Sequence, residues 1–315
     1  MSERETASPD SQAITGGSIP GGEGQPAYVL HRQKTSAIPI LIAVPHAGRE
    51  YPASLVNRMR HPGEAAPRLE DRYVDLVARK VADATGAALL VANAPRAMID
   101  LNRSPEDIDW EMISGPRSGY VRSRLAAGRR SRSGLGLVPR RLPGLGELWR
   151  QRLPAADLSR RIEEVHAPYH LALSQTLEHV RDRWGAALLL DLHSMPPLGP
   201  KAGVGAAVDF VVGDRFGASC EGHLASIALD HFEIKGARAA HNRPYAGGYV
   251  LDRHGAPARG LSAIQLEICR AIYLDPQLRE PGEGLDDVAE LVTGLVLRLA
   301  SAVESNARGF SQAAE

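Results

Sequence analysis

Two histidines and one glutamate lie at the ends of apolar runs, or within one, where they could build a metal site. His46 follows one run of strand length, His193 follows a second, and Glu267 interrupts a third. Two neutral imidazoles and a carboxylate would form a three-ligand zinc site with a fourth position open for water. Metal binding lowers the pKa of that water from about 15.7 to about 7, and a nearby carboxylate can accept its proton. The pattern predicts a hydrolytic metal site with Glu267 as proton acceptor, although a histidine after a strand can also be a hydrogen-bonded loop residue.

The carboxylate that would complete this metal site has two candidates. Glu50 lies four residues after His46, near enough in sequence to reach the same ion. Asp71 opens an amphipathic stretch and would be brought to the ion by the fold. Glu70 and Asp71 also suit the first turn of a helix, where negative side chains complement the helix dipole. The third ligand therefore stays open between Glu50 and Asp71.

A second group of polar side chains, in segment 96–103, has the residue types that bind carboxylates. Arg103 can bind a carboxylate through two parallel hydrogen bonds, and Asn102 beside it can add another. Arg96 would then face the negative charge that develops on the attacked carbonyl oxygen. The alternative is that Asp100 simply pairs with one of these arginines in a structural ion pair.

The segment 242–249 has the composition of a loop that contacts a substrate. It combines turn-forming residues with Arg243 and two tyrosines. Gly247 and Gly248 permit backbone conformations that other residues resist, as such a loop would require. An ordinary surface turn is the alternative explanation.

His166 and His170 are four residues apart, a spacing that places two side chains on one face of a helix. Such a pair could hold a second metal ion. However, Pro168 between them breaks or kinks a helix, and the glutamate of an HExxH motif is absent. A structural role for both histidines is the preferred interpretation.

Short apolar runs alternate with amphipathic stretches, and these are the elements that must position the polar groups. The runs predict buried strands, and the stretches repeat apolar residues at helical spacing. This alternation is typical of an α/β sandwich with helices on both faces of the sheet, in which ligands bind at the carboxyl ends of the strands. The expected strands are 38–44, 87–91, 186–192, 208–212 and 263–268, and the expected helices are 69–84, 157–183, 216–232 and 285–303.

We expect a single catalytic domain over residues 27–308, with tails at 1–26 and 309–315. The first tail is rich in Ser, Gly, Glu and Gln, a composition typical of disorder. Within the domain, segment 114–152 holds ten arginines against one acid, Glu147. A flexible or lid-like insertion near an anionic site is the preferred interpretation of this segment, and a basic arm for nucleic acid is the alternative.

The composition favours a globular protein that acts on a small molecule. The 315 residues are 43% hydrophobic and 23% charged, with 37 basic and 37 acidic side chains. A formal net charge of zero lacks the excess positive charge of a dedicated nucleic-acid binder. Two cysteines cannot form a disulfide framework, and no apolar run reaches the roughly 18 residues of a membrane helix. Because the N-terminal segment also lacks an apolar signal sequence, we expect a cytoplasmic protein that binds neither nucleic acid nor membrane.

Taken together, these segments resemble the N-formylglutamate amidohydrolase family. The matching segments follow the family's order over roughly residues 39–275. They are VPHAG at 44–48 with Tyr51-Pro52, EDRYVD at 70–75, RAMIDLNR at 96–103, PYH at 168–170, DLHS at 191–194, Asn242 with PYAGGY at 244–249, and QLEICR at 265–270. The ordered set is more specific than any one segment.

The family is similar in fold to zinc-dependent exopeptidases and aspartoacylases, which implies a three-layer α/β/α sandwich around a mostly parallel mixed sheet. By this resemblance His46 and His193 would bind zinc, or another divalent ion. Those relatives use an HxxE arrangement, but Arg49 stands at that position here. Asp71, with Glu50 as second choice, would therefore supply the third ligand.

The reaction that the resemblance implies is hydrolysis of the N-formyl amide of N-formyl-L-glutamate to formate and L-glutamate, the last step of one histidine-degradation route. The implied roles are general base for Glu267, oxyanion stabiliser for Arg96, and substrate binding for Asn102, Arg103, Arg243 and Tyr245. Arg243 is included because the small anionic substrate carries two carboxylates, which need at least two cationic partners. One alternative is a zinc amidohydrolase or carboxypeptidase-like enzyme for a different acyl group. A non-catalytic binding protein on the same scaffold is another.

Overall fold

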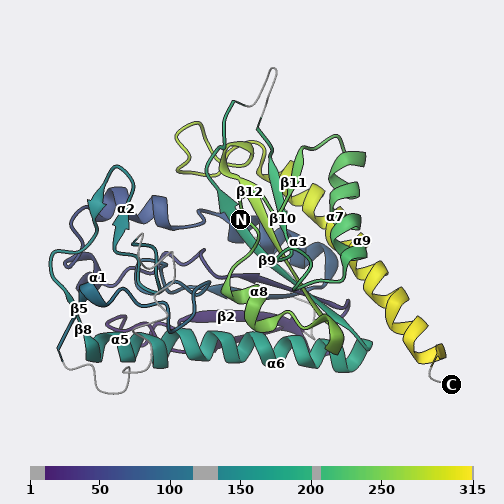
Figure 1. Ribbon diagram of the computed structural model, residues 1–315, viewed down its shortest axis with the longest axis horizontal. Coiled ribbons are helices and arrows are strands. Elements are labelled where there is room, and N and C mark those ends of the chain that lie inside the picture. The colour runs from purple at the N-terminus through teal and green to yellow at the C-terminus, as the bar shows by residue number, and fades with distance from the viewer. Residues whose placement is uncertain (1–10, 116–133, 201–206, 314–315) are drawn as a thin grey trace, which may run out of the picture.

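A mixed sheet of eight strands lies at the centre of the structure, a computed structural model that describes residues 11–115, 134–200 and 207–313 (Figure 1). In order across the sheet, the strands are β1 (Ser11–Gly16), β2 (Tyr28–Gln33), β4 (Ala88–Ala92), β3 (Ile40–Val44), β9 (Ala187–Met195), β12 (Leu261–Cys269), β10 (Phe210–Gly213) and β11 (Ala239–His241). Neighbours from β4 through β3 and β9 to β12 are parallel, as are β10 and β11. The pairs β1–β2, β2–β4 and β10–β12 are antiparallel. The mostly parallel mixed sheet is therefore confirmed.

Helices cover both faces of this sheet and complete the three layers (Figure 1). One face carries α3 (Val74–Thr85), α7 (Gly222–Ile234) and α9 (Leu285–Ala313), and the other carries α6 (Ala167–Trp184) and α8 (Tyr249–His254). Successive side chains of a strand point to opposite faces. Ile40 and Ile42 of β3 thus belong to the core with α3 and α9, whereas Leu41 and Ala43 belong to the core with α6. The predicted α/β/α fold class is confirmed.

The five predicted strands are all present, as β3, β4, β9, β10 and β12, with small shifts at their ends. The predicted helix 157–183 is divided into α5 (Ala155–Arg161), a π-helical turn at Ile162–His166, and α6. The backbone stays helical through this turn, and Pro168 has no N–H to donate to the Glu164 carbonyl, which accepts instead from the Ser18 N–H. The proline therefore interrupts the helical pattern without ending it.

The predicted helix 69–84 begins later than the pattern suggests. Its first residue belongs to a separate helix, α2 (Pro62–Leu69), and Tyr73 has a left-handed φ of 55° that a continuous helix cannot contain. The turn between the two helices carries Asp71. The late start of α7 has the same cause, since Phe216 has a φ of 56°.

The predicted insertion 114–152 lies partly outside the described residues, which omit 116–133. Its later part forms a hairpin that packs on α2 through Leu142 and Leu148. Arg140 in this part pairs with three carboxylates, so its charge is compensated inside the fold. The remaining short elements are α1 (Ala53–Val56), η1 (Trp110–Met112), β5 (Ile113–Ser114), β6 (Arg141–Leu142), β7 (Gly146–Glu147), β8 (Leu153–Pro154), η3 (Pro257–Arg259) and η4 (Arg270–Ile272).

Both ends of the chain differ from the expected tails. Within the predicted tail 1–26, β1 pairs with β2 along its whole length, and Ile19 is buried in the core under α6. Within the predicted tail 309–315, α9 continues to Ala313. An edge strand needs mainly backbone partners, so a polar composition does not prevent it. Across the described ranges, no helix is both long and apolar enough to cross a membrane.

Gly48 allows the chain to pass close to the end of β4 immediately after His46. A Cβ at Gly48 would collide with the backbone carbonyl of Ala94 and lie 2.6 Å from the oxygen of Asn93. We expect Gly48→Ala to lower the free energy of unfolding by about 1–3 kcal/mol in urea titrations. The matched control is Gly63→Ala in α2, where a Cβ meets nothing within 4 Å. An equal loss in both variants would contradict this explanation.

Candidate metal centre

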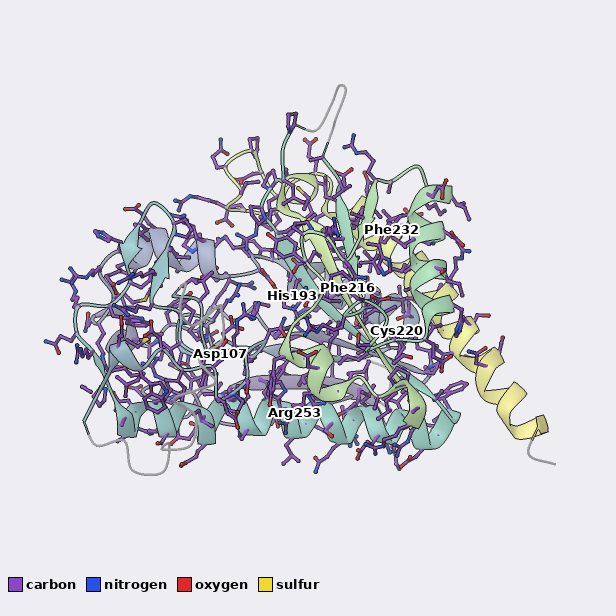
Figure 2. The ribbon with its side chains drawn as sticks, viewed as in Figure 1. Asp107, His193, Phe216, Cys220, Phe232 and Arg253 are labelled. Atoms are coloured by element: carbon purple, nitrogen blue, oxygen red, sulfur yellow. The ribbon has the colours of Figure 1, made fainter. Side chains whose placement is uncertain are left out.

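The polar side chains that the sequence singled out meet at the carboxyl ends of the parallel strands. His46 lies two residues beyond β3, and His193 and Glu267 are paired in register on β9 and β12. A cavity opens there, and Figure 2 labels His193 near the middle of the molecule. The predicted site residues that line this cavity are His46, Asp71, Arg96, Asn102, Arg103, His193, Tyr245 and Glu267.

Three of these residues could hold a metal ion. His46, Asp71 and His193 are buried, and each offers a ligand atom within 4.8 Å of the other two. Asp71 Oδ2 lies 3.6 Å from His46 Nδ1 and 2.9 Å from His193 Nδ1. His46 Nδ1 is buried without a hydrogen-bond partner among the described residues, which is unusual for a polar atom. An ion bonded to this nitrogen would remove the anomaly, so the residues fit a metal.

Each histidine is oriented by a carboxylate on its other nitrogen. His46 Nε2 lies 2.7 Å from Asp100 Oδ1, and His193 Nε2 lies 2.9 Å from Asp191 Oδ2. Because a carboxylate can only accept, a neutral imidazole that bound a metal would carry its proton on Nε2 and offer its Nδ1 lone pair to the ion. Carboxylate–histidine pairs of this kind are the usual surroundings of metal-binding histidines.

The charges of the site are strongly coupled to one another. Although burial disfavours its charged form, the carboxylates of Asp191 and Asp71 raise the pKa of His193 well above its ordinary value. Burial likewise opposes ionisation of Asp71, but the hydrogen bond from His193 and the nearby His46 imidazole hold the pKa of Asp71 well below its usual range. Positive charge is therefore favoured at this point of the fold, whether carried by protons or by a cation.

Asp71, and not Glu50, is the acid that the fold brings to the histidines. The Asp71 backbone N–H donates to the His46 carbonyl at 2.9 Å, which fixes the turn before α3 against the end of β3. Arg270 Nη2 lies 3.3 Å from Asp71 Oδ1. Glu50 is exposed and accepts a hydrogen bond from Gln25. Glu50 as an alternative third ligand is therefore wrong.

Glu267 lies beside the side chains of His46, Asp71 and His193, in a position to exchange protons. Gln265 Nε2 donates to Glu267 Oε1 at 2.8 Å and orients the carboxyl group. Burial raises the pKa of Glu267 to about 7. A carboxyl group with this pKa can both accept and release a proton near neutral pH.

Segment 96–103 combines the two interpretations that its sequence left open. Asp100 does form an ion pair, because Arg96 Nε and Nη2 both lie 2.9 Å from Asp100 Oδ2. Arg96 nevertheless lines the cavity. The Asn102 amide donates to Gln265 Oε1 at 3.2 Å, and its oxygen accepts from the Val250 N–H at 2.9 Å. Asn102 is thus tied into the fold, and Arg103 beside it offers the charge of the expected clamp.

The loop 242–249 contributes Tyr245, Gly247 and Gly248 to the cavity, but not Arg243. Arg243 is exposed and is not among the residues that line the cavity. A Cβ at Gly248 would lie 2.5 Å from Asn102 Oδ1, so the close approach of this loop requires glycine. The prediction that Arg243 lies in the cavity is therefore wrong.

Sequence reasoning missed two arginines that line the cavity, Arg68 and Arg270. Arg270 is buried and committed to the fold, since it donates to Ser194 and to the Pro67 and Glu70 carbonyls. Its position three residues after Glu267 is a feature of the sequence that could have identified it. Arg68 lies exposed on α2, and no motif marks it.

His166 and His170 lie behind segment 96–103, apart from the three candidate ligands. His166 Nε2 lies 2.9 Å from the Arg103 carbonyl, and His170 Nε2 lies 3.0 Å from the Leu101 carbonyl. Both histidines thus make structural contacts, as predicted.

The chain is similar to known proteins over most of its length. The family model described as N-formylglutamate amidohydrolase matches residues 38–274. N-formylglutamate deformylase of Pseudomonas putida is 29% identical over 254 residues, covering 80% of this chain and 87% of that protein. The deformylase of Pseudomonas aeruginosa is 29% identical over 276 residues, covering 84% and 92%. The crystal structure of N-formylglutamate amidohydrolase from Ralstonia eutropha JMP134 has a TM-score of 0.80 and 32% identity, covering 89% of this chain and 99% of that one.

Proposed function

The chain belongs to the N-formylglutamate amidohydrolase family, and from this premise we propose that it hydrolyses N-formyl-L-glutamate to formate and L-glutamate. The deformylase and amidohydrolase names of its relatives support this substrate. The observation that carries the proposal is the meeting of His46, Asp71 and His193 with Glu267 in one cavity that arginines also line. The alternative of a non-catalytic protein gives no reason for a buried, ionisable carboxyl beside three candidate metal ligands.

His46, Asp71 and His193 are the residues that would hold the metal, and zinc suits two imidazoles and one carboxylate. When bound, zinc supplies a Lewis acid for the formyl carbonyl and a lowered pKa for water. The Nε2 bonds to Asp100 and Asp191 keep both imidazoles in the tautomer that such binding requires.

The other groups of the cavity move protons and balance charge. Glu267 accepts a proton from the attacking water and passes it to the amine nitrogen as the amide bond breaks. Arg96, held by Asp100, places its guanidinium near the carbonyl oxygen where negative charge develops. The scissile bond is the amide between the formyl carbon and the glutamate nitrogen, so water adds to the carbon to give formate and the nitrogen leaves as the amino group of L-glutamate.

The two carboxylates of the substrate need two cationic partners, and we assign Arg103 and Arg68 to them. Both line the cavity, whereas Arg243 does not. We expect Arg68→Gln to raise KM for N-formyl-L-glutamate about tenfold or more, because a hydrogen bond to a charged group contributes about 1.5–3 kcal/mol. Steady-state kinetics of the same variant should show a smaller rise in KM for an N-formyl amino acid with an uncharged side chain. Arg243→Gln is the matched control, and equal effects of both variants would contradict the assignment.

The proposed function is tested by formate release from metal-loaded protein. N-formyl-L-glutamate is compared with N-formyl-L-aspartate and N-acetyl-L-glutamate, which change the side-chain length and the acyl group in turn. Fastest turnover of N-formyl-L-glutamate is the expected result. Faster cleavage of N-acetyl-L-glutamate would overturn the substrate and keep the metallohydrolase, whereas turnover of none of them would overturn the function.

We also place the enzyme in the cytoplasm as one catalytic domain. At opposite ends of the described chain, β1 is an edge strand of the central sheet and α9 packs on that sheet. Cys220 and Cys269 are free and buried, which supports a reducing compartment.

A further inference from the structure

Three buried histidines lie directly behind the segment that carries Asn102 and Arg103. His166 and His170 come from the π-helical turn and from α6, and His254 is the last residue of α8. Their exposed fractions are 2%, 0% and 6%. None of the three is among the residues that line the cavity at the metal centre. Any effect of these histidines on the reaction must therefore pass through the residues that they hold.

The hydrogen bonds of the three histidines fix their protonation. A carbonyl oxygen only accepts, so the contacts with the Arg103 and Leu101 carbonyls place a proton on Nε2 of both His166 and His170. His170 Nδ1 is then the acceptor for His254 Nε2, 3.0 Å away. Burial lowers the pKa of all three imidazoles, that of His254 to about 3. His254 and His170 thus form a neutral chain of hydrogen bonds that ends on the Leu101 carbonyl, and His166 donates separately to the Arg103 carbonyl.

Every residue of segment 101–103, which these rings contact, takes part in a hydrogen bond. The Asn102 N–H donates to Asp100 Oδ1 at 2.8 Å, and the Asn102 carbonyl accepts from Arg103 Nη1 at 2.7 Å. The carbonyls of Leu101 and Arg103, on either side of Asn102, accept the hydrogen bonds from the histidines. Displacing either carbonyl would therefore move the Arg103 side chain relative to the metal ligands.

Helix α8 is connected to the same segment at both of its ends. At its start, the Val250 N–H donates to Asn102 Oδ1 at 2.9 Å. At its end, His254 reaches the Leu101 carbonyl through His170. The helix and the segment are thus joined in a closed ring of hydrogen bonds, with the glycine loop before α8 on the cavity side.

We propose that His166, His170 and His254 are positioning residues that hold segment 101–103 in the place from which Arg103 binds the substrate carboxylate. This inference rests on the proposed function, because substrate binding by Arg103 is part of it. The three side chains touch neither the substrate nor the metal. Loss of one bond in the chain should weaken substrate binding more than it slows the chemical step.

The test compares His254→Leu, which removes the donor to His170, with His254→Gln, whose amide N–H can still donate. We expect His254→Leu to raise KM for N-formyl-L-glutamate about five- to twentyfold, with kcat within about threefold and metal content unchanged. His254→Gln should restore most of the wild-type KM. The matched control is His231→Leu, because His231 is also buried and bonded to a carbonyl, Leu291, but lies between α7 and α9. This control should lower the melting temperature and leave KM unchanged.

The outcomes separate this inference from the proposed function. Absence of turnover by the wild-type protein would count against the proposed function. This result would be obtained without any of the variants. With an active wild type, an unchanged KM in His254→Leu, or an equal rise in His231→Leu, overturns the positioning role. Nitrogen-15 NMR of the wild-type protein adds a measurement that needs no variant to fold. It should show His170 as the neutral Nε2–H tautomer at pH 7, and a protonated or Nδ1–H ring would overturn the inference.

Discussion

Replacing Glu267 with glutamine is expected to lower kcat for N-formyl-L-glutamate by about 10²–10⁴-fold, the usual contribution of a general base. Glutamine keeps the size of the side chain and a partner for Gln265, but it cannot accept a proton. KM and metal content should stay near the wild-type values, because Glu267 is not among the three candidate ligands. Formate release and metal analysis on the same samples measure both quantities.

The same variant should change the pH profile. Burial raises the pKa of Glu267 to about 7, and a bound cation nearby favours the carboxylate and lowers this value. As the pH falls through the pKa, the base becomes protonated and kcat/KM falls, so the wild-type profile should have an acid limb at or below pH 7. This limb should be absent from the residual activity of Glu267→Gln. The control is Glu50→Gln, because it removes an exposed carboxylate by the same substitution. Similar losses of activity in both variants would rule out the role assigned to Glu267.

The strand ends were the most predictable part of this site. His46, His193 and Glu267 follow or interrupt apolar runs, and parallel strands bring such positions to one edge of a sheet. Asp71 could not be separated from Glu50 by spacing. That choice depends on one backbone hydrogen bond, from Asp71 N–H to the His46 carbonyl, between residues on different elements.

Other parts of the structure left no pattern in the sequence. β1 is held to β2 by backbone pairing, which polar residues permit. Because this pairing leaves no apolar pattern in the sequence, the polar composition of the segment suggested disorder. Arg243 is exposed and does not line the cavity, and its charge alone could not place it inside or outside. His254 has no neighbour at motif spacing, because its partner His170 lies 84 residues away in the chain.

Removal of one histidine ligand is the second change with a large expected effect. We expect His193→Ala to lose bound zinc and at least about 10³-fold in kcat/KM, because loss of a ligand would remove the Lewis acid and the activated water that the ion would supply. Metal binding to the wild-type protein should also release a proton at pH 7. Although burial opposes it, Asp191 and Asp71 raise the pKa of His193 and favour the protonated form of the metal-free imidazole, whereas a ligand must be neutral. Calorimetric titrations in buffers of different ionisation enthalpy measure the proton, and the apparent affinity should rise with pH.

A matched histidine separates loss of the ligand from loss of any imidazole. His179→Ala removes an exposed histidine of α6 and should keep metal, activity and proton release unchanged. If His193→Ala bound zinc as tightly as the wild type, the ion would have to lie elsewhere than between His46, Asp71 and His193. If instead zinc were lost but turnover persisted, the metal would be structural and Glu267 alone would have to activate water. The two expected losses occur together only if the buried Nδ1 atoms and Asp71 hold the ion that the reaction uses.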